Sequence, residues 1–316
     1  MSGTRAGIVW NPSKTTKEDL ETALSDSQQT DGARLSWFET SEDDPGRGAT
    51  QRALDAGVDV VLAAGGDGTV RACAEHLADT NAEADLGIIP LGTGNLLARN
   101  LDVPLNDLSA AFTRALTGPG RPLDIGWAEV TLPGGVKRRA FAVMAGFGID
   151  AHMITETDDE LKDRAGWLAY VESLGRAVSA TEVIGIRLAV DGAPAEQENA
   201  HTLIVGNCGT LQGGIPLLPD ADPADGELDL LVLHADGIAG WTDTMRNMIW
   251  DNGLKRLLKG GGGNERAQSS EATTHRRLES LTIELDEPRV FEVDGDDLGE
   301  VTRIRIGVQP AAIRVR

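Results

Sequence analysis

The stretch VDVVLAAGGDGTVRACAEHLADT, residues 58–80, decides the fold of this chain. Its first seven residues are mostly aliphatic and predict a short buried strand, and residues 69–80 have the spacing of a helix with one apolar face. Gly65, Gly66 and Gly68 separate the two segments and leave backbone amides free to face an anion at the start of the helix. A strand, a glycine-rich turn and a helix in this order predict an α/β domain that binds a phosphate group.

The first 125 residues repeat this alternation. Strands are predicted at 6–10, 34–39, 58–64 and 86–90, and helices at 49–57, 69–80 and 105–118. Strands and helices that alternate at this pitch predict a parallel sheet with helices on its faces.

Polar turns follow three of these strands. They are WNPSK at 10–14, GGDGTV at 65–70 and PLGTGNLLARN at 90–100. Ligands of parallel sheets bind outside the carboxyl ends of the strands, so the three turns predict one anion-binding site. The P-loop pattern GxxxxGK[ST] does not occur in the sequence, which excludes a P-loop protein.

From about residue 127 the pattern becomes mostly β. Residues 127–145 predict a hairpin that turns at Pro133-Gly134-Gly135, and a helical stretch follows at about 155–180. Further strands are predicted at 182–192, 201–207, 227–236, 280–287, 289–295 and 303–309, with a glycine-rich polar loop at 259–275. These patterns predict a second, mostly β domain with inserted helices.

The composition excludes several classes of protein. The net charge of −21 opposes binding to nucleic acid, whose phosphates need a basic face. No run of about 18 apolar residues occurs, and the first residues lack the apolar core of a signal peptide, so we expect neither a membrane span nor export. Cys73 and Cys208, the two cysteines, have no metal-ligand neighbour at a useful spacing. A reduced, cytoplasmic protein fits these features.

Seven motifs occur in order along nearly the whole chain: NPSK, GGDGT, PLGTGN, RPLDIG, GFGIDA, DPADGELD and VDGD. In this order they resemble the diacylglycerol kinase catalytic-domain family, which includes soluble bacterial lipid kinases, sphingosine kinases and ceramide kinases. The resemblance implies ATP- and Mg²⁺-dependent phosphorylation of a lipid hydroxyl, with diacylglycerol as the default acceptor.

The resemblance also implies a fold of α/β plus mostly β type. Residues 1–125 and a returning segment at 299–316 would form a Rossmann-like nucleotide-binding domain similar to that of NAD kinases and phosphofructokinases. Residues 126–298 would form a β-sandwich-type lipid-binding domain.

The same resemblance places ATP on the three polar turns. The residues expected to line the site are Asn11, Pro12, Ser13, Lys14, Thr15, Thr40, Gly65, Gly66, Asp67, Gly68, Thr69, Val70, Gly92, Thr93, Gly94 and Asn95. The carboxylate of Asp67 would repel a phosphate, so we expect it to face Mg²⁺ through water.

Asp294 is the candidate general base, with Asp296 beside it. Asp294 follows a predicted strand, and a carboxylate there serves as a base if burial or the charge of Asp296 raises its pKa toward neutrality. The alternative is a turn aspartate that caps its own loop. Asp124, at the junction of the two domains, would join the active-site metal network or simply begin a strand.

The acidic loop 218–230 predicts a second cation site. Its oxygen-rich side chains suit Mg²⁺, and the resemblance assigns a structural Mg²⁺ to Asp222, Asp225 and the backbone of Glu227. The alternative is a solvated acidic loop.

Four positions depart from the family's usual motifs. Arg71 and Ala72 stand where the family has Asn and Glu, Leu96 stands where many members have an acid, and Asp296 replaces Glu. These departures leave open a catalytically inactive lipid- or nucleotide-binding protein, and the shared GGDGT motif leaves open a NAD kinase.

Residues 241–260 carry apolar side chains followed by Lys255, Arg256 and Lys259, which predicts either peripheral contact with the inner face of the membrane or a helix packed on its own domain. Residues 166–178 are a second candidate for the lipid cleft. The partners expected are a lipid at the membrane surface and no nucleic acid, and a homodimer is left open.

Overall fold

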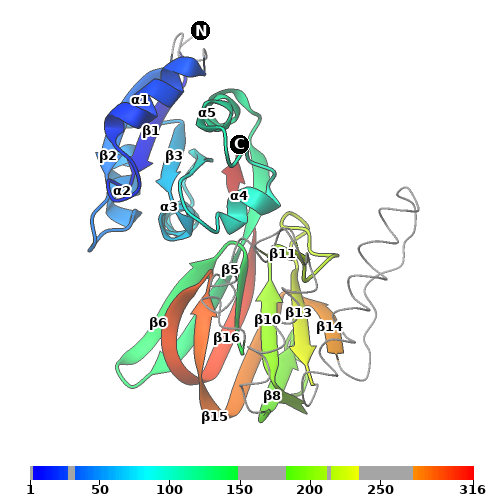
Figure 1. Cartoon of the computed structure of the whole chain (residues 1–316). Helices are drawn as coiled ribbons and strands as arrows, with labels where there is room; N and C mark the ends of the chain where they lie inside the picture. The colour runs from blue at the N-terminus through cyan, green and yellow to red at the C-terminus, as the bar shows by residue number, and fades with distance from the viewer. Residues whose placement is uncertain (1–2, 28–32, 149–182, 212–214, 235–272) are drawn as a thin grey trace, which may run out of the picture.

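The computed structural model of the chain describes residues 3–27, 33–148, 183–211, 215–234 and 273–316. Within these residues, buried apolar side chains form two hydrophobic clusters, one in the α/β part and one in the β part. The two parts lie one above the other in Figure 1, with the α/β part at the top.

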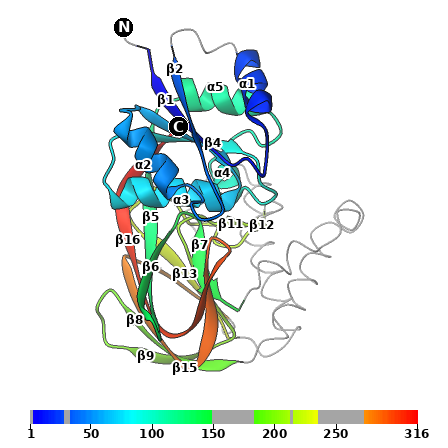
Figure 2. The same cartoon turned by 90° about the vertical axis from the view of Figure 1, so that its left-hand side faces the viewer.

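The α/β part contains a parallel sheet in the order β4-β3-β1-β2. Its strands are β1 (Arg5–Trp10), β2 (Arg34–Glu39), β3 (Val60–Gly65) and β4 (Asp85–Pro90). Its helices are α1 (Lys17–Asp26), α2 (Arg47–Asp55), α3 (Asp67–Asp79), α4 (Leu96–Asn100) and α5 (Leu108–Thr117). Helices cover both faces of this sheet (Figure 2), and β3 and β4 are buried along their whole length, as the central strands of a parallel sheet are. The predicted alternation is confirmed.

The β part is an antiparallel arrangement around the second cluster. Its strands are β5 (Arg121–Leu132), β6 (Gly135–Phe141), β7 (Met144–Phe147), β8 (Ile184–Val190), β9 (Glu196–Ala200), β10 (Thr202–Gly206), β13 (Leu228–Leu233), β14 (Thr273–Leu278), β15 (Ser280–Val293) and β16 (Asp296–Val315). Two short strands, β11 (Thr210–Leu211) and β12 (Ile215–Pro216), pair with each other.

Several predicted β elements have different limits in the structure. The predicted hairpin turns between β5 and β6 as expected, but its second strand ends at Phe141, and β7 pairs with β10 and β15 instead. The two strands predicted at 280–287 and 289–295 form one strand, β15, whose pairing is irregular between Glu284 and Arg289. Pro288 lies in that interval and has no N–H to donate. Residues 273–275 of the predicted loop belong to β14, and the predicted helix at 155–180 lies outside the described residues.

Strand β16 connects the two parts. It pairs with β15 from Asp296 to Gly307 and with β5 from Ile304 to Val315, and Val315 also pairs with Leu86 of the parallel sheet. Its pairing with β5 shifts between Gln309 and Ile313, and Ala311 has a φ of +45° there. The strand, red in Figure 1, therefore carries the chain from the β part back into the α/β part. The division at residues 125 and 299 stays a prediction.

Candidate active site

The first glycine turn forms the N-terminus of α3. Gly66 precedes the helix and Asp67 is its first residue. A side chain at Gly65 would come within 2.5 Å of Thr69, so this strand end tolerates only glycine. A Cβ at Gly68 would have no atom within 4 Å. Position 68 thus faces open space among the described residues, in the first turn of a helix, where helix geometry leaves backbone amides available to an anion.

The second glycine turn packs directly on the first. A Cβ at Gly92 would lie 2.8 Å from the Cα of Gly66, so the two backbones touch. The buried Asn95 closes this turn, because its Oδ1 accepts from the amide of Gly92 at 2.9 Å and its Nδ2 donates to the Gly92 carbonyl at 2.7 Å. The side chain predicted as an ATP contact is therefore engaged inside its own loop.

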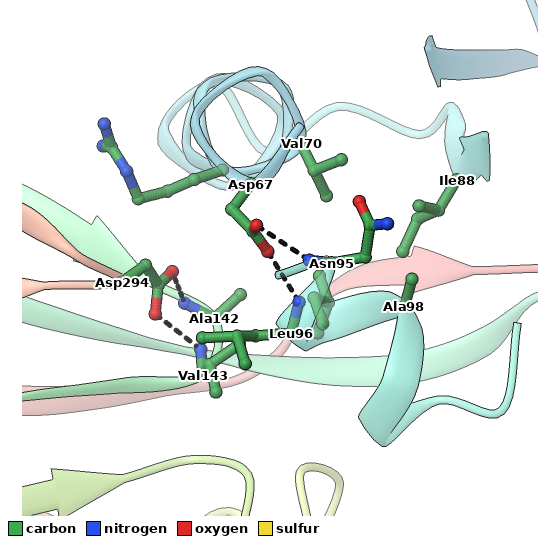
Figure 3. Close-up of a pocket in the computed structure, with 11 residues that line it drawn as sticks. Asp67, Val70, Ile88, Asn95, Leu96, Ala98, Ala142, Val143 and Asp294 are labelled. Carbon is green, nitrogen blue, oxygen red and sulfur yellow. Dashed lines mark hydrogen bonds between the residues drawn. The ribbon is translucent and has the colours of Figure 1, made fainter. Parts of the chain in front are cut away.

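Asp67 joins the two turns. Its carboxylate oxygens accept from the backbone amides of Asn95 at 2.8 Å and Leu96 at 2.6 Å, as Figure 3 shows. The carboxylate therefore lies at the N-terminus of α4, where a negative charge is favourable. Each oxygen keeps a second lone pair, so the donor chemistry fits a hard cation such as Mg²⁺.

The NPSK turn lies at the same edge of the sheet. Asn11 Oδ1 accepts from the amide and the hydroxyl of Ser13 at 2.9 and 2.8 Å, which shapes the turn locally. The backbone N–H of Asn11 donates to the carbonyl of Ala64 near the end of β3. Lys14 is exposed. Thr40 is buried just after β2, and its amide donates to Trp10 at 2.9 Å.

Asp294 lies in a tight turn between β15 and β16. Asp294 and Gly295 have φ angles of +47° and +83°, the left-handed values of a two-residue hairpin turn. Its Oδ2 accepts from the amide of Ala142 at 2.8 Å, and its Oδ1 accepts from Val143 and Met144 at 3.0 and 2.9 Å. These amides are available because the chain leaves the β6 ladder after Phe141.

Burial raises the pKa of Asp294 to about 6, although the three backbone hydrogen bonds and the charge of Arg71 lower it. Asp294 lines a pocket with Asp67 (Figure 3), so the structure brings together two predicted catalytic residues that lie far apart in the sequence. The remaining residues of this pocket are Val70, Arg71, Ile88, Asn95, Leu96, Leu97, Ala98, Ala142 and Val143.

Asp124 lies elsewhere, where β5 passes between the two parts. It is 1% exposed, and its carboxylate accepts from the amides of Gly226 at 2.7 Å and Ala311 at 2.6 Å. It thereby holds the irregular stretch of β16 and the acidic loop against β5. Its role in a metal network stays a prediction.

The acidic loop has a cationic partner from its own chain. The guanidinium of Arg277, on β14, contacts Asp225 and lies 2.9 Å from Glu227. Asp222 accepts from the amide of Ala224 at 3.1 Å. Within the described residues no group of three His, Cys, Asp or Glu side chains is arranged to hold a metal ion. Arg277 would therefore compete with a cation for these two side chains, and the structural Mg²⁺ site stays a prediction.

Two site residues make contacts that the sequence did not reveal. Arg71 lines the pocket and contacts Asp296, the second acid of the VDGD motif. The buried Asn207 donates from its side chain to the carbonyls of Asp124 and Ala142, at 2.8 and 3.0 Å, and so fixes the chain beside the amides that bind Asp294. A polar residue after an apolar strand was the available hint for Asn207.

The two segments predicted to contact lipid, 166–178 and 241–260, lie outside the described residues. Among the helices that the structure describes, none has the length and apolar character needed to cross a bilayer.

Comparisons with known proteins cover both parts of the chain. Residues 5–128 match the diacylglycerol kinase catalytic domain, and residues 143–316 match the YegS C-terminal NAD kinase beta sandwich-like domain. A protein of Pseudomonas aeruginosa strain UCBPP-PA14 named probable lipid kinase YegS-like is 31% identical over 308 residues, which are 98% of this chain and 92% of that protein. The diacylglycerol kinase of Bacillus subtilis strain 168 is 29% identical over 238 residues, which are 74% of this chain and 75% of that protein.

The crystal structure of a diacylglycerol kinase from Bacillus anthracis strain Sterne shares the fold, with a TM-score of 0.70, 21% identity, and coverage of 100% of this chain and 97% of that chain. The predicted fold class, α/β plus mostly β with a β-sandwich-type second part, is confirmed. The chain therefore belongs to the diacylglycerol kinase catalytic-domain family and is a lipid kinase.

Proposed function

We propose that this kinase transfers the γ-phosphoryl group of ATP to the hydroxyl of diacylglycerol, in a Mg²⁺-dependent reaction that yields phosphatidic acid. The observation that carries the proposal is the pocket in which Asp294, an acid with its pKa raised to about 6, faces the paired glycine turns. Such a pKa leaves the carboxylate ionised at neutral pH and basic enough to accept a proton.

ATP would lie on the glycine turns at the start of α3. The amides there, the open space at Gly68 and the positive end of the helix macrodipole suit the phosphates. Lys14, exposed on the neighbouring turn, would add positive charge. Thr40, Thr93 and the remaining predicted contacts lie on or next to these turns.

The proton would go to Oδ2 of Asp294. Two amides occupy both lone pairs of Oδ1, whereas Oδ2 accepts from Ala142 alone among the described residues and so keeps one lone pair. As the lipid hydroxyl oxygen forms its bond to the γ-phosphorus, its proton passes to Oδ2, and the bond from the γ-phosphorus to the β,γ-bridging oxygen breaks to release ADP. The three amides hold the carboxylate in one orientation throughout this step.

Asp67 would hold Mg²⁺, directly or through water. When bound, the ion offsets the negative charge that the phosphate oxygens carry. Asp67 also keeps the two glycine turns in contact, so its carboxylate serves the site even before a cation binds.

We further propose that the enzyme acts in the cytoplasm and touches the inner face of the membrane transiently to reach its lipid, with residues 1–125 and 299–316 binding ATP and residues 126–298 binding lipid. Residues 241–260 would make the membrane contact, and a homodimer is compatible with the proposal. Reduced vesicle binding by a Trp241→Ala, Trp250→Ala variant, measured by co-sedimentation, would support that contact.

The test of the substrate is labelling of a total bacterial lipid extract with γ-³²P-ATP and Mg²⁺. The expected product is labelled phosphatidic acid. Labelling of a different lipid would refute diacylglycerol, labelling of added NAD would indicate a NAD kinase, and ATP binding without any transfer would indicate an inactive nucleotide-binding protein.

A further inference from the structure

Arg71 joins the helix of the first glycine turn to the turn that carries Asp294. It lies on α3, four residues after Asp67 and therefore on the same face of the helix. Its Nη2 contacts the carboxylate of Asp296, and its Nη1 donates to Glu75 at 3.2 Å. Asp296 faces Val293 across the two-residue turn that contains Asp294. The guanidinium of Arg71 thus connects α3 with the turn that carries Asp294, although Arg71 and Asp296 are 225 residues apart in the sequence.

Glu75 anchors the other side of Arg71. Its side chain is 4% exposed, and it accepts from the amide of Ala140 at 3.2 Å. Arg47 also pairs with Glu75, at 2.5 Å, from the outer side of α3. Ala140 lies just before the amides that bind Asp294, so Arg71 and Glu75 hold α3 against both chain segments that fix the base.

The burial of Arg71 is difficult to explain by stability alone. The residue is 8% exposed, whereas the side chain of its partner Asp296 is 50% exposed. Burying a charge costs desolvation free energy, which the pairs with the buried Glu75 and the half-exposed Asp296 offset only in part. Among the described residues, the Nε of Arg71 also has no hydrogen-bond partner. An arginine that is buried at a cost in desolvation free energy, and that lines the pocket, is expected where it positions a functional group.

We infer that Arg71 is a positioning residue of this kinase. Through its ion pair with Asp296, it holds the turn that carries Asp294 at a fixed place relative to the glycine turns. The inference rests on the proposed function of Asp294 as the base. It also accounts for two of the unusual residues in the sequence together, because the long side chain at position 71 spans to the short acid at position 296.

The test compares five full-length variants with wild type in the lipid kinase assay: Arg71→Met, Arg71→Lys, Asp296→Asn, the Arg71→Met, Asp296→Asn double variant and Arg187→Met. Arg71→Met keeps the length of the side chain and removes the charge and the donors. Displacement of a reacting group by about 1 Å costs on the order of 100-fold in rate, so we expect kcat to fall by about 10- to 100-fold while the KM for ATP changes less than about threefold. Asp296→Asn should reproduce the loss, and the Arg71→Met, Asp296→Asn double variant should be no slower than the worse single variant.

Arg71→Lys should recover part of the rate, because a lysine ammonium can still reach the acid. Arg187→Met is the matched control, since it removes an arginine that pairs with Glu284 between β8 and β15, outside the pocket, and should leave kcat unchanged. A wild-type kcat in both Arg71→Met and Asp296→Asn would overturn the inference, as would a loss confined to the KM for ATP, which would make Arg71 a nucleotide ligand. Absence of lipid phosphorylation in wild type would instead refute the proposed function.

Discussion

A methyl group added at Gly68 should stabilise the protein and weaken ATP binding at the same time. Gly68 is the second residue of α3, and a Cβ there meets no atom within 4 Å. Its φ is not in the left-handed region, so alanine fits the helical backbone. Replacing an exposed helical glycine by alanine is worth about 0.4 to 1 kcal/mol, which corresponds to a rise in Tm of about 2 °C for a chain of this size.

The same methyl would occupy the space in which the phosphates are proposed to lie. Loss of one charge-assisted hydrogen bond costs about 1.5 to 3 kcal/mol, so the Kd for ATP should increase about 10- to 100-fold. Isothermal titration with ATP and a thermal melt measure the two effects on the same preparation.

Gly134 provides the matched control. It lies in the exposed turn between β5 and β6, and a Cβ there also meets no atom within 4 Å. Gly134→Ala should leave the Kd for ATP unchanged. If Gly68→Ala binds ATP as tightly as wild type does, the phosphates do not lie over the start of α3, and the proposed nucleotide site is wrong.

Three further predictions concern the acids of the molecule. Asp294 must be ionised to accept a proton, and burial raises its pKa to about 6. The kcat/KM should therefore rise about tenfold per pH unit below pH 6 and level off above it. A profile that stays flat down to pH 5 would contradict this. Arg277→Met removes the cation that pairs with Asp225, so the Tm of this variant without Mg²⁺ should be lower than that of wild type. Added Mg²⁺ should raise the Tm of the variant more than the Tm of wild type. An equal response in both proteins would rule out competition between Arg277 and Mg²⁺. Asp124→Ala leaves two backbone amides without their acceptor, so the free energy of unfolding in urea should fall by about 2 to 5 kcal/mol, and a loss below about 0.5 kcal/mol would show that water replaces the carboxylate.

The alternation of strands and helices was predictable from local patterns. The glycine turn at 65–68 lies between an aliphatic strand and a helical pattern, and each of these has its own periodicity in the sequence. The burial of α3 on every side from Thr69 to Ala78 was not predicted from that pattern. The tight turn at Asp294 was also predictable, because Asp-Gly between apolar segments is typical of such a turn.

The partners of the acids were not predictable in the same way. The donors that fix the carboxylates of Asp67 and Asp294 are backbone amides, which nearly every residue carries, so no sequence pattern marks them. The amides that bind Asp294 are free because β6 ends at Phe141. This end lies inside a continuous apolar run, which in the sequence resembles an uninterrupted strand. Arg71 and Asp296 are brought together only by the fold, as are Arg277 and Asp225.

The measurement that tests the central claim most directly is the rate of ³²P transfer from γ-labelled ATP to diacylglycerol vesicles by wild type, Asp294→Asn and Asp191→Asn. Asp191 is the matched control, because it also lies in a left-handed Asp-Gly turn and accepts two backbone amides, from Glu279 at 2.9 Å and Ser280 at 2.8 Å, outside the pocket. Asparagine at position 294 cannot take up the proton, so we expect its rate to fall by about 100-fold or more with ATP binding retained, while Asp191→Asn keeps the wild-type rate. A folded Asp294→Asn protein that phosphorylates diacylglycerol at the wild-type rate would contradict the account.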